Sequence, residues 1–429
     1  MGKVDMRYTH NPWLWIPTLC TVEEIPSTVV MYVALLMFLQ FGADNALASL
    51  YSAMFFLPWV MKSYFYSKVR KAGAFKRSLH VVEVLMFLCL MGIAVYVSEA
   101  DVQVWVLFLF LFLLSCLCAW HELLSRLYYS RMLRPQSQLV FMGTKLLSSQ
   151  VAQVVTYGVL IIMAGGFEVF FRSYQKAWAM ESSLVAGGFL VALVLNVIVL
   201  RNPKLVDRYR YETLARAVKN ELHVLSRMRQ KEHVFPVLLC FFFLLLPQAL
   251  LFNTRVFFLL SSVEEGGLGC SVQDVGFAQG TIGVLAFSLG LAGGGLLMKR
   301  QGARSLFWPA SFLLTLSPLS YTLMAHNPHP NQLLLLCCVT FFAQFCLGFG
   351  LNVSRLFVPY ISELRYRNTT NFLTVPLVAS LMVVPMALSG WLCAELGYRT
   401  FFLACVAIAP LAWILLIVCK TKQILLIHE

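Results

Sequence analysis

The sequence predicts an all-α, polytopic membrane protein with twelve membrane-spanning helices. Of its 429 residues, 59% are hydrophobic and only 12% are charged, whereas soluble domains carry roughly 25% charged residues. The mean hydropathy of +0.76 agrees with this composition. A span needs about 20 apolar residues and takes roughly 35 residues with its connection, so a chain of this length holds about twelve. This composition excludes a water-soluble enzyme.

Twelve apolar runs follow one another along the chain, and one long polar stretch separates the first six from the last six. The runs cover residues 25–41, 48–66, 79–98, 102–124, 139–164, 179–200, 234–258, 274–298, 306–324, 332–357, 371–394 and 398–418. We therefore predict a six-helix bundle in residues 1–200, a basic cytoplasmic linker in 201–233 and a second six-helix bundle in 234–429. The linker has apolar residues at helical spacing, as in an amphipathic helix at an anionic membrane surface or in a plain connecting helix.

Basic residues fall very unevenly on the two sides of the predicted membrane. One side, with both termini, holds 29 of the 33 lysines and arginines, and the other side has only Arg172, Lys176, Arg255 and Arg399. Because cytoplasmic loops collect Lys and Arg, both termini are predicted to be cytoplasmic. The net charge of +13 has the same origin, so no nucleic-acid partner is expected.

Neither a cofactor nor an enzymatic activity is indicated by the motifs. The sequence has no GxxxxGK[ST], HExxH or GxSxG pattern, and its twelve cysteines form no CxxC pair. We expect no metal site, no cofactor and no enzyme activity. The first apolar stretch is interrupted by Pro17, Glu23, Glu24 and Pro26. We therefore expect the first span to begin near residue 25, with no cleavable signal peptide.

Several phrases, in the same order along almost the whole chain, carry a family resemblance. Two basic loops occupy equivalent places in the two halves, and the second contains a Gly-Gly pair followed by Lys299, Arg300 and Arg304. Other shared phrases are Asn11-Pro12-Trp13, Leu57-Pro58-Trp59, Glu265-Gly266-Gly267-Leu268-Gly269, Gln344-Phe345 and Leu396-Gly397-Tyr398. The chain resembles major facilitator transporters, and within them the AmpG-type muropeptide permeases, in the form found in Bacteroidetes. The resemblance implies two six-helix bundles that alternate access to a central site.

The sequence departs from the resembled family at several ionisable positions. Family acids in spans seven and ten are matched here by Gln248 and Gln344, and an Asp-Arg pair after span two is matched by Arg70-Lys71. A span-four His-Asp pair is matched by His121-Glu122, with Arg126 in place of a second Asp. The resemblance therefore implies the fold more directly than it implies the coupling mechanism.

Polar residues share one face of the predicted spans five and ten. At 100° per residue, Lys145, Ser149, Gln153, Thr156 and Tyr157 lie within one arc, which favours a face turned toward a cavity or toward neighbouring helices. Gln344, Asn352 and Arg355 form a similar arc in span ten, unless Arg355 simply marks the cytoplasmic end. The sequence leaves two interpretations of Lys145 open, a buried cation or a side chain that snorkels. The candidate substrate-binding residues are Lys145, Gln153, Gln248, Gln344, Asn352 and Arg355.

Proton coupling needs a buried group that titrates. His121 and Glu122 are the candidates, although Arg126 is placed to pair with Glu122 at i,i+4. Glu23 and Glu83 are expected near the membrane boundary, and without proton coupling the protein would be a uniporter.

The sequence thus predicts a multi-pass inner-membrane secondary transporter, acting as a monomer on a small molecule within the lipid bilayer. By resemblance, its substrate is an anionic cell-wall fragment of the muropeptide type. The alternatives are another organic solute, or a transporter-derived sensor or scaffold that binds without moving its ligand.

Overall fold

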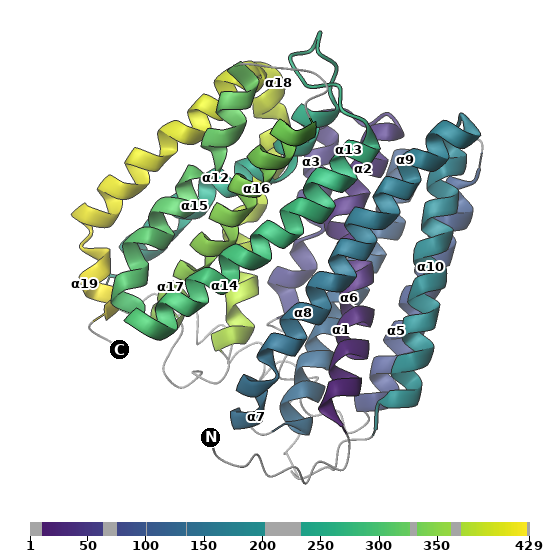
Figure 1. The fold of residues 1–429 in the computed structure, drawn as a ribbon, viewed down its shortest axis with the longest axis horizontal. Helices are drawn as coiled ribbons and strands as arrows, with labels where there is room; N and C mark the ends of the chain where they lie inside the picture. Colours follow the sequence, from purple (N-terminus) through teal and green to yellow (C-terminus); the bar gives the residue numbers. More distant parts are fainter. Residues whose placement is uncertain are drawn as a thin grey trace.

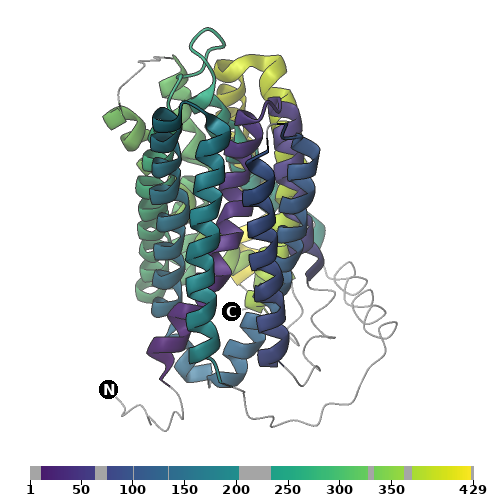
Figure 2. The ribbon, with the colours of Figure 1, turned by 90° about the vertical axis from the view of Figure 1, so that its right-hand side faces the viewer.

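The computed structural model is entirely helical in the residues that it describes, which are 11–62, 75–99, 101–133, 135–201, 233–326, 333–361 and 370–426. The helices run in two groups, α1 to α10 in one half of the molecule and α12 to α19 in the other (Figure 1). Within the first half, seen face-on in Figure 2, the helices run nearly parallel from end to end. The predicted linker, residues 201–233, lies almost wholly outside the described residues.

The first half is built from the following elements. They are α1 (Pro12–Thr28), η1 (Val29–Val33), α2 (Ala34–Gln40), α3 (Asn45–Met54), α5 (Phe75–Val97), α6 (Val104–Met132), α7 (Pro135–Val140), α8 (Met142–Gln153), η2 (Val154–Val159), α9 (Leu160–Phe171) and α10 (Tyr174–Val199). Here η1 and η2 are π-helical segments that join α1 to α2 and α8 to α9 into continuous long helices.

The second half follows the same plan. Its elements are α12 (Val234–Leu260), α13 (Val272–Val275), η3 (Gly276–Gly283), α14 (Val284–Gln301), α15 (Ala303–His326), α16 (Leu333–Gly350), η4 (Leu351–Val353), α17 (Ser354–Ile361), α18 (Thr370–Val418) and α19 (Thr421–Leu426). The long α18 contains a break at Gly397, whose φ of 72° lies in the left-handed region that favours glycine.

Local sequence explains where several helices begin. Asn11 caps α1 by accepting a hydrogen bond from the Trp13 amide at 3.1 Å, with Pro12 in the first turn. Asp44 caps α3, Ser173 caps α10, and Ser271 with Asp274 forms a capping box before the η3 segment. These caps lie at the ends of apolar runs, so the spans start where the backbone amides find a side-chain acceptor.

Nine helices within the described residues are long and apolar enough to cross a membrane. The segments α3 and α15 add two further helices, and α18 carries two of the predicted runs on either side of its break at Gly397. Each of the twelve predicted runs therefore overlaps a described helix, in the predicted order, and the run 48–66 continues beyond the described residues. Many large apolar side chains remain exposed, such as Val81, Leu109, Val151 and Val191, as expected of helices that face lipid.

The first span is longer than predicted. Its helix begins at Pro12 instead of near residue 25 and continues to Gln40, with Pro17 and Pro26 inside it. The interruptions were misleading because a membrane helix tolerates proline when neighbouring helices satisfy the freed carbonyls. As a result, Glu23 and Glu24 lie within the span and not before it.

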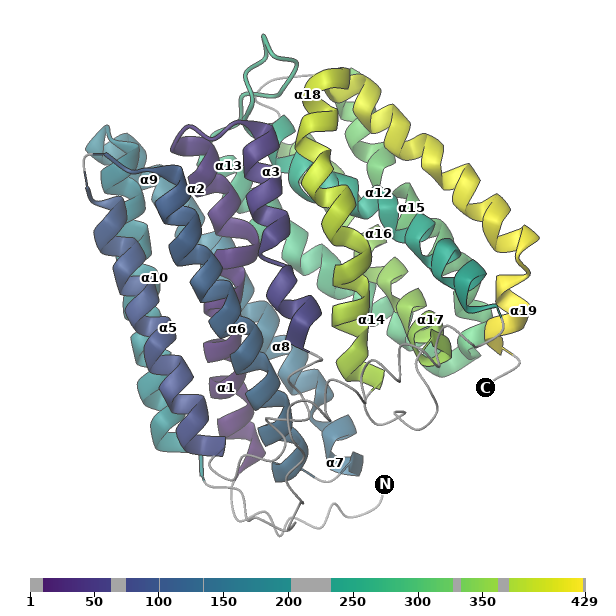
Figure 3. The same cartoon turned by 180° about the vertical axis from the view of Figure 1, so that it is seen from behind.

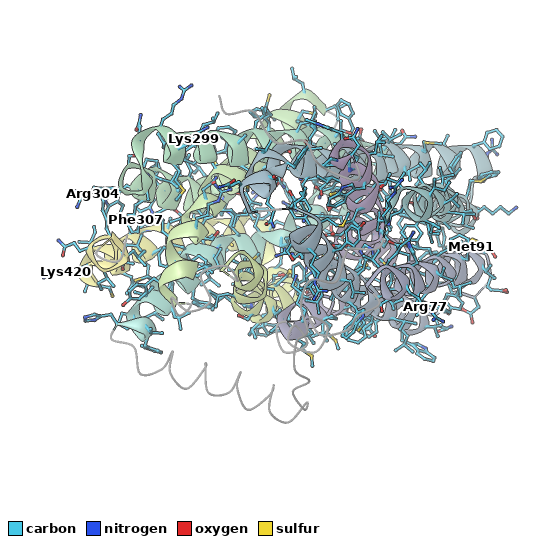
Figure 4. The ribbon with its side chains drawn as sticks, turned by 90° about the horizontal axis from the view of Figure 1, so that it is seen from below. Arg77, Met91, Lys299, Arg304, Phe307 and Lys420 are labelled. Atoms are coloured by element: carbon cyan, nitrogen blue, oxygen red, sulfur yellow. The ribbon has the colours of Figure 1, made fainter. Side chains whose placement is uncertain are left out.

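The two halves approach each other at one end and diverge at the other (Figures 1 and 3). We call the end where the halves approach the upper end, and the opposite end, where α1 begins and α19 ends, the lower end. Contacts between the halves join α3 to α18, η2 to η3 and α9 to α13. Seen from below, Figure 4 shows Arg77 on the first half and Lys299, Arg304 and Lys420 on the second; the four are exposed. They belong to the side predicted to be cytoplasmic.

Candidate functional site

Two close helix crossings hold the halves together toward the upper end. A Cβ atom added to Gly280 would lie 2.2 Å from the Tyr157 carbonyl oxygen, and one added to Gly158 would lie 2.6 Å from Oγ1 of Thr281. On the other side of the molecule, a Cβ on Gly390 would lie 2.0 Å from the Asn45 carbonyl oxygen. Small residues let helix backbones approach this closely. The glycines therefore close the molecule at its upper end.

The polar face predicted for span five turns into the molecule. Gln153, Thr156 and Tyr157 are buried, whereas Leu147 and Val151 on the opposite face are exposed. Across from this face, Tyr32 of η1 stacks on Tyr157 with ring centroids 5.0 Å apart and pairs with the Gln153 side chain. The part of the predicted arc from Gln153 to Tyr157 is therefore an interior surface next to the second half, whereas Lys145 and Ser149 are half-buried.

Lys145 lies below this stack, on α8. Its Nζ is 5.5 Å from the centre of the Tyr129 ring, a cation–π contact. The Glu24 carboxyl pairs with Ser149, one turn along α8, and lies within the electrostatic reach of Lys145. Lys145 therefore has an acidic neighbour, Glu24, on the first span. The sequence analysis had placed Glu24 before that span.

Glu122 of α6 is surrounded by donors. It pairs with Lys62 at 2.6 Å and with Arg126 at 2.5 Å, and it accepts a hydrogen bond from the Trp59 indole at 2.7 Å. The i,i+4 pair with Arg126 is therefore confirmed. Glu23 joins the same region through a hydrogen bond from Ser125. Buried charges in a bilayer are costly unless they are balanced, and here the Glu122 carboxylate has two cations close by.

His121 is adjacent in sequence but belongs to a different cluster. Its Nε2 lies 3.2 Å from Glu83, which also contacts His80 Nδ1 at 2.7 Å and accepts a hydrogen bond from Asn196 at 2.6 Å. Glu83 is fully buried between α5, α6 and α10. His121 and Glu122 belong to different clusters because a helix turns 100° between successive residues, so two neighbours face different helices.

The predicted residues of the second half lie in several environments. Gln248 is buried and donates to the Leu314 carbonyl, and Asn352 donates to the carbonyls of Leu291, Gly348 and Phe349. Gln344 contacts Gln279 at 3.4 Å, while Arg355 is exposed toward the lower end. Gln344 therefore forms a buried amide pair with Gln279, whereas Gln248 and Asn352 hold helices of the same half together.

Several residues that lie in the interior of the protein were not among the candidate site residues of the sequence analysis. They are Lys62, Glu24, Glu83, Tyr32, Arg255 and Gln279. The amide of Gln279 donates to Tyr321 at 2.8 Å and to Thr340 at 3.3 Å. Arg255 was counted with the cations of the outer side, and it is only 6% exposed within α12. A charge three residues before the end of the apolar run 234–258 was the signal that could have found it.

A pocket of about 830 Å³ lies at the upper end, between the halves. The first half contributes Gln40, Asn45 and Glu168, and the second contributes Phe257, Ser261, Glu265 and Cys270, with other residues nearby. Because it lies directly above the close helix crossings, we call it the outer pocket; a solute that reaches the interface between the halves from the upper end would pass through it.

Comparisons with solved structures were made with this geometry in hand. Structures that cover nearly the whole chain include a peptide transporter POT (TM-score 0.68, 12% identity, 98% of this chain and 96% of that one) and the nucleoside transporter NupG (0.67, 12%, 96% and 99%). A third is the bacterial homologue of the lysosomal transporter Spinster in an inward-facing, occupied conformation (0.66, 14%, 96% and 98%). The chain has the fold of the major facilitator transporters.

Sequence comparison adds a more distant likeness. Two curated relatives, the anhydromuropeptide permeases of Escherichia coli strains K12 and O157:H7, are each 28% identical over 154 residues. The match covers 36% of this chain and 31% of each permease, so it spans about a third of the length of these relatives. No family model matches the chain. These proteins are transporters and not enzymes, as the sequence predicts for this one.

Proposed function

We propose that this multi-pass membrane protein is a secondary transporter that moves an anionic organic solute by alternating access between its two halves. Support comes from the fold and from the polar face of span five, which lies in the interior and next to the second half. An interior face of this kind is what a solute pathway requires, because lipid-facing helix surfaces are apolar. The upper closure and the divergent lower end correspond to a state open toward the predicted cytoplasm.

The proposed substrate is a cell-wall fragment of the muropeptide type. The printed name of the Escherichia coli relatives and the phrases shared with that family support this choice. In the proposal, Lys145 and Arg355 attract carboxylate groups, while Gln153 and Gln344 form hydrogen bonds with sugar or peptide groups. Gln248 and Asn352 act mainly by holding the helices that carry these groups, since their amides already donate to backbone carbonyls.

Any proton coupling is proposed to run through His121 rather than through Glu122. Glu122 is balanced by two cations, so a proton there would break two ion pairs at once. His121 and Glu83 share one buried contact that a single proton would change. If neither group carries a proton, the protein is a uniporter.

A sensor or scaffold derived from a transporter is the second candidate, favoured by the glutamines at Gln248 and Gln344 where the resembled family has acids. Reconstitution separates the two functions. Purified protein in liposomes should show saturable uptake of a labelled anhydromuropeptide with counterflow, whereas a sensor would bind the same solute without net or exchange flux. We also propose that the protein lies in the inner membrane, which membrane fractionation would test. We propose that it is a monomer, which light scattering of the protein in detergent would test.

A further inference from the structure

Arg255 of α12 differs from the other deeply buried cation of the structure. Among the described residues, Lys62 and Arg255 are the two basic side chains that are more than nine-tenths buried, at 2% and 6% exposure. Lys62 is neutralised by Glu122 at 2.6 Å. Within the described part of the chain, Arg255 has no acidic partner within ion-pair distance, and its Nε is shielded from solvent without a hydrogen-bond partner.

Leaving a guanidinium in this state is costly, which argues for a partner absent from the chain itself. Arg is always charged, and a buried charge without a counterion is strongly unfavourable. The nearest compensation is the face of Phe252, whose ring centre lies 5.3 Å from the Arg255 guanidinium carbon. A cation–π contact contributes about 2 kcal/mol or more in a desolvated site, but it offers no hydrogen-bond acceptor to the guanidinium N–H groups.

Aromatic rings from the opposite half face this cation. Tyr32 lies 5.8 Å from Phe252 and stacks on Tyr157, and both tyrosines are within electrostatic reach of Arg255. Phe56 completes the group, 5.6 Å from Phe252. The cation and Phe252 therefore belong to the second half, while the stacked tyrosines and Phe56 belong to the first.

We propose that Arg255, Phe252, Tyr32 and Tyr157 form a binding site for a carboxylate carried on a sugar ring. A guanidinium binds a carboxylate through two parallel hydrogen bonds, and Phe252 with the Tyr32–Tyr157 stack provides the apolar wall beside which a sugar ring would lie. The tyrosine hydroxyls and Gln153 then face the hydroxyl groups of the sugar. This inference rests on the proposed transport function and adds to it a residue for the charged group of the substrate.

The placement of the site couples binding to the position of the two halves. When the upper crossing at Gly158 and Gly280 opens, the tyrosines and Arg255 move apart with their own halves. A bound carboxylate would therefore stabilise the arrangement in which the upper end is closed. Arg255 lies on α12 two residues before Phe257, which lines the outer pocket.

The test compares two sugars that differ in one group. N-acetylmuramic acid carries a carboxylate on a lactyl ether, and its methyl ester lacks the charge. Binding is measured by isothermal titration calorimetry on the purified full chain in nanodiscs. The parent should bind the acid more tightly than the ester, and Arg255→Gln should weaken binding of the acid by about ten- to a hundredfold while leaving the ester unchanged. Arg172→Gln, which removes an exposed outer cation, is the matched control and should bind both sugars as the parent does.

Arg255→Lys keeps the experiment decisive if Arg255→Gln does not fold. Lysine keeps the charge but cannot form two parallel hydrogen bonds, so it should bind the acid several-fold more weakly than the parent and bind the ester equally well. Equal affinity of the parent, Arg255→Lys and any folded Arg255→Gln protein for the acid would overturn the proposed site. A parent that takes up muropeptide with no role for Arg255 would leave the transport proposal intact. Arg255-dependent binding without flux would retain the site and reject transport.

Discussion

Replacing Gly280 with alanine tests whether the closed upper end depends on the η2–η3 crossing. The new Cβ atom would lie 2.2 Å from the Tyr157 carbonyl oxygen and 2.6 Å from the Gly158 nitrogen. Both neighbours are backbone atoms in the opposite half, so no side-chain rotation can relieve the overlap. Inserting a methyl group into a closely packed site costs about 1–3 kcal/mol.

That cost falls on one state of the transport cycle. The crossing exists only while the upper end is closed, so Gly280→Ala should destabilise the closed state and leave the state open at the upper end unaffected. A cost of about 2 kcal/mol shifts the equilibrium roughly thirtyfold toward upper-end opening, since 1.4 kcal/mol is a factor of ten. The fold itself should be preserved, because each half keeps its own core.

Cys270 provides a native reporter for this shift. It lines the outer pocket, and burial together with the nearby charge of Asp274 raises the pKa of its thiol to about 11. Its reaction with an impermeant maleimide should therefore be slow near pH 7, because only the thiolate reacts. The accessible cysteines Cys116, Cys337, Cys338 and Cys419 are first replaced by alanine.

Gly280→Ala should accelerate the labelling of Cys270 at least severalfold and lower the affinity of any ligand that requires upper closure. Gly187→Ala is the matched control, because a Cβ at Gly187 meets nothing within 4 Å and its labelling should equal that of the parent. Unchanged labelling in Gly280→Ala, with unchanged thermal stability, would show that the crossing does not hold the upper end closed.

The remaining five predictions concern single residues of the fold. Lys145→Gln should weaken binding of an anionic sugar more than Lys145→Arg does, and equal affinities by calorimetry would assign Lys145 a structural role. Glu122→Gln should lower thermal stability strongly, by roughly 3–5 kcal/mol, because Lys62 and Arg126 lose their partner; an unchanged melting temperature would contradict the balanced cluster. Uptake driven by a pH gradient should be lost in Glu83→Gln or His121→Asn, and its survival in both variants would place the proton elsewhere. An introduced cysteine at Glu264 should label from outside intact cells and one at Lys422 should not, and the reverse pattern would invert the predicted topology. The Cys270 labelling rate should rise with pH up to about 11, since the thiol has a raised pKa.

The fold was predictable because it depends on properties that the sequence states directly. Apolar length gives the helices, and the uneven distribution of Lys and Arg gives the predicted orientation. The polar arc from Lys145 to Tyr157 needed only the helical repeat, and it turned inward as expected. The pair of Glu122 with Arg126 followed from i,i+4 spacing.

Contacts between segments that are distant in the sequence could not be predicted in this way. Nothing in the sequence around Glu83 shows that His121 and Asn196 will reach it from two other helices, and the pairing of Lys62 with Glu122 joins residues 60 positions apart. Glu24 was misplaced because prolines were taken as the end of a polar tail. Arg255 was only counted as a cation of the outer side, because its surroundings depend on Tyr32 of the opposite half, which the sequence does not show.

The central claim is that the chain moves a solute across the membrane, and solute flux tests it most directly. Purified protein is reconstituted into liposomes loaded with unlabelled anhydromuropeptide, and labelled anhydromuropeptide is added outside. The proposal predicts rapid, saturable counterflow of the label, absent from liposomes without protein and reduced in Arg255→Gln. Tight binding of the label to the same proteoliposomes, without its appearance in the lumen, would contradict transport and identify the protein as a sensor or scaffold that kept the transporter fold.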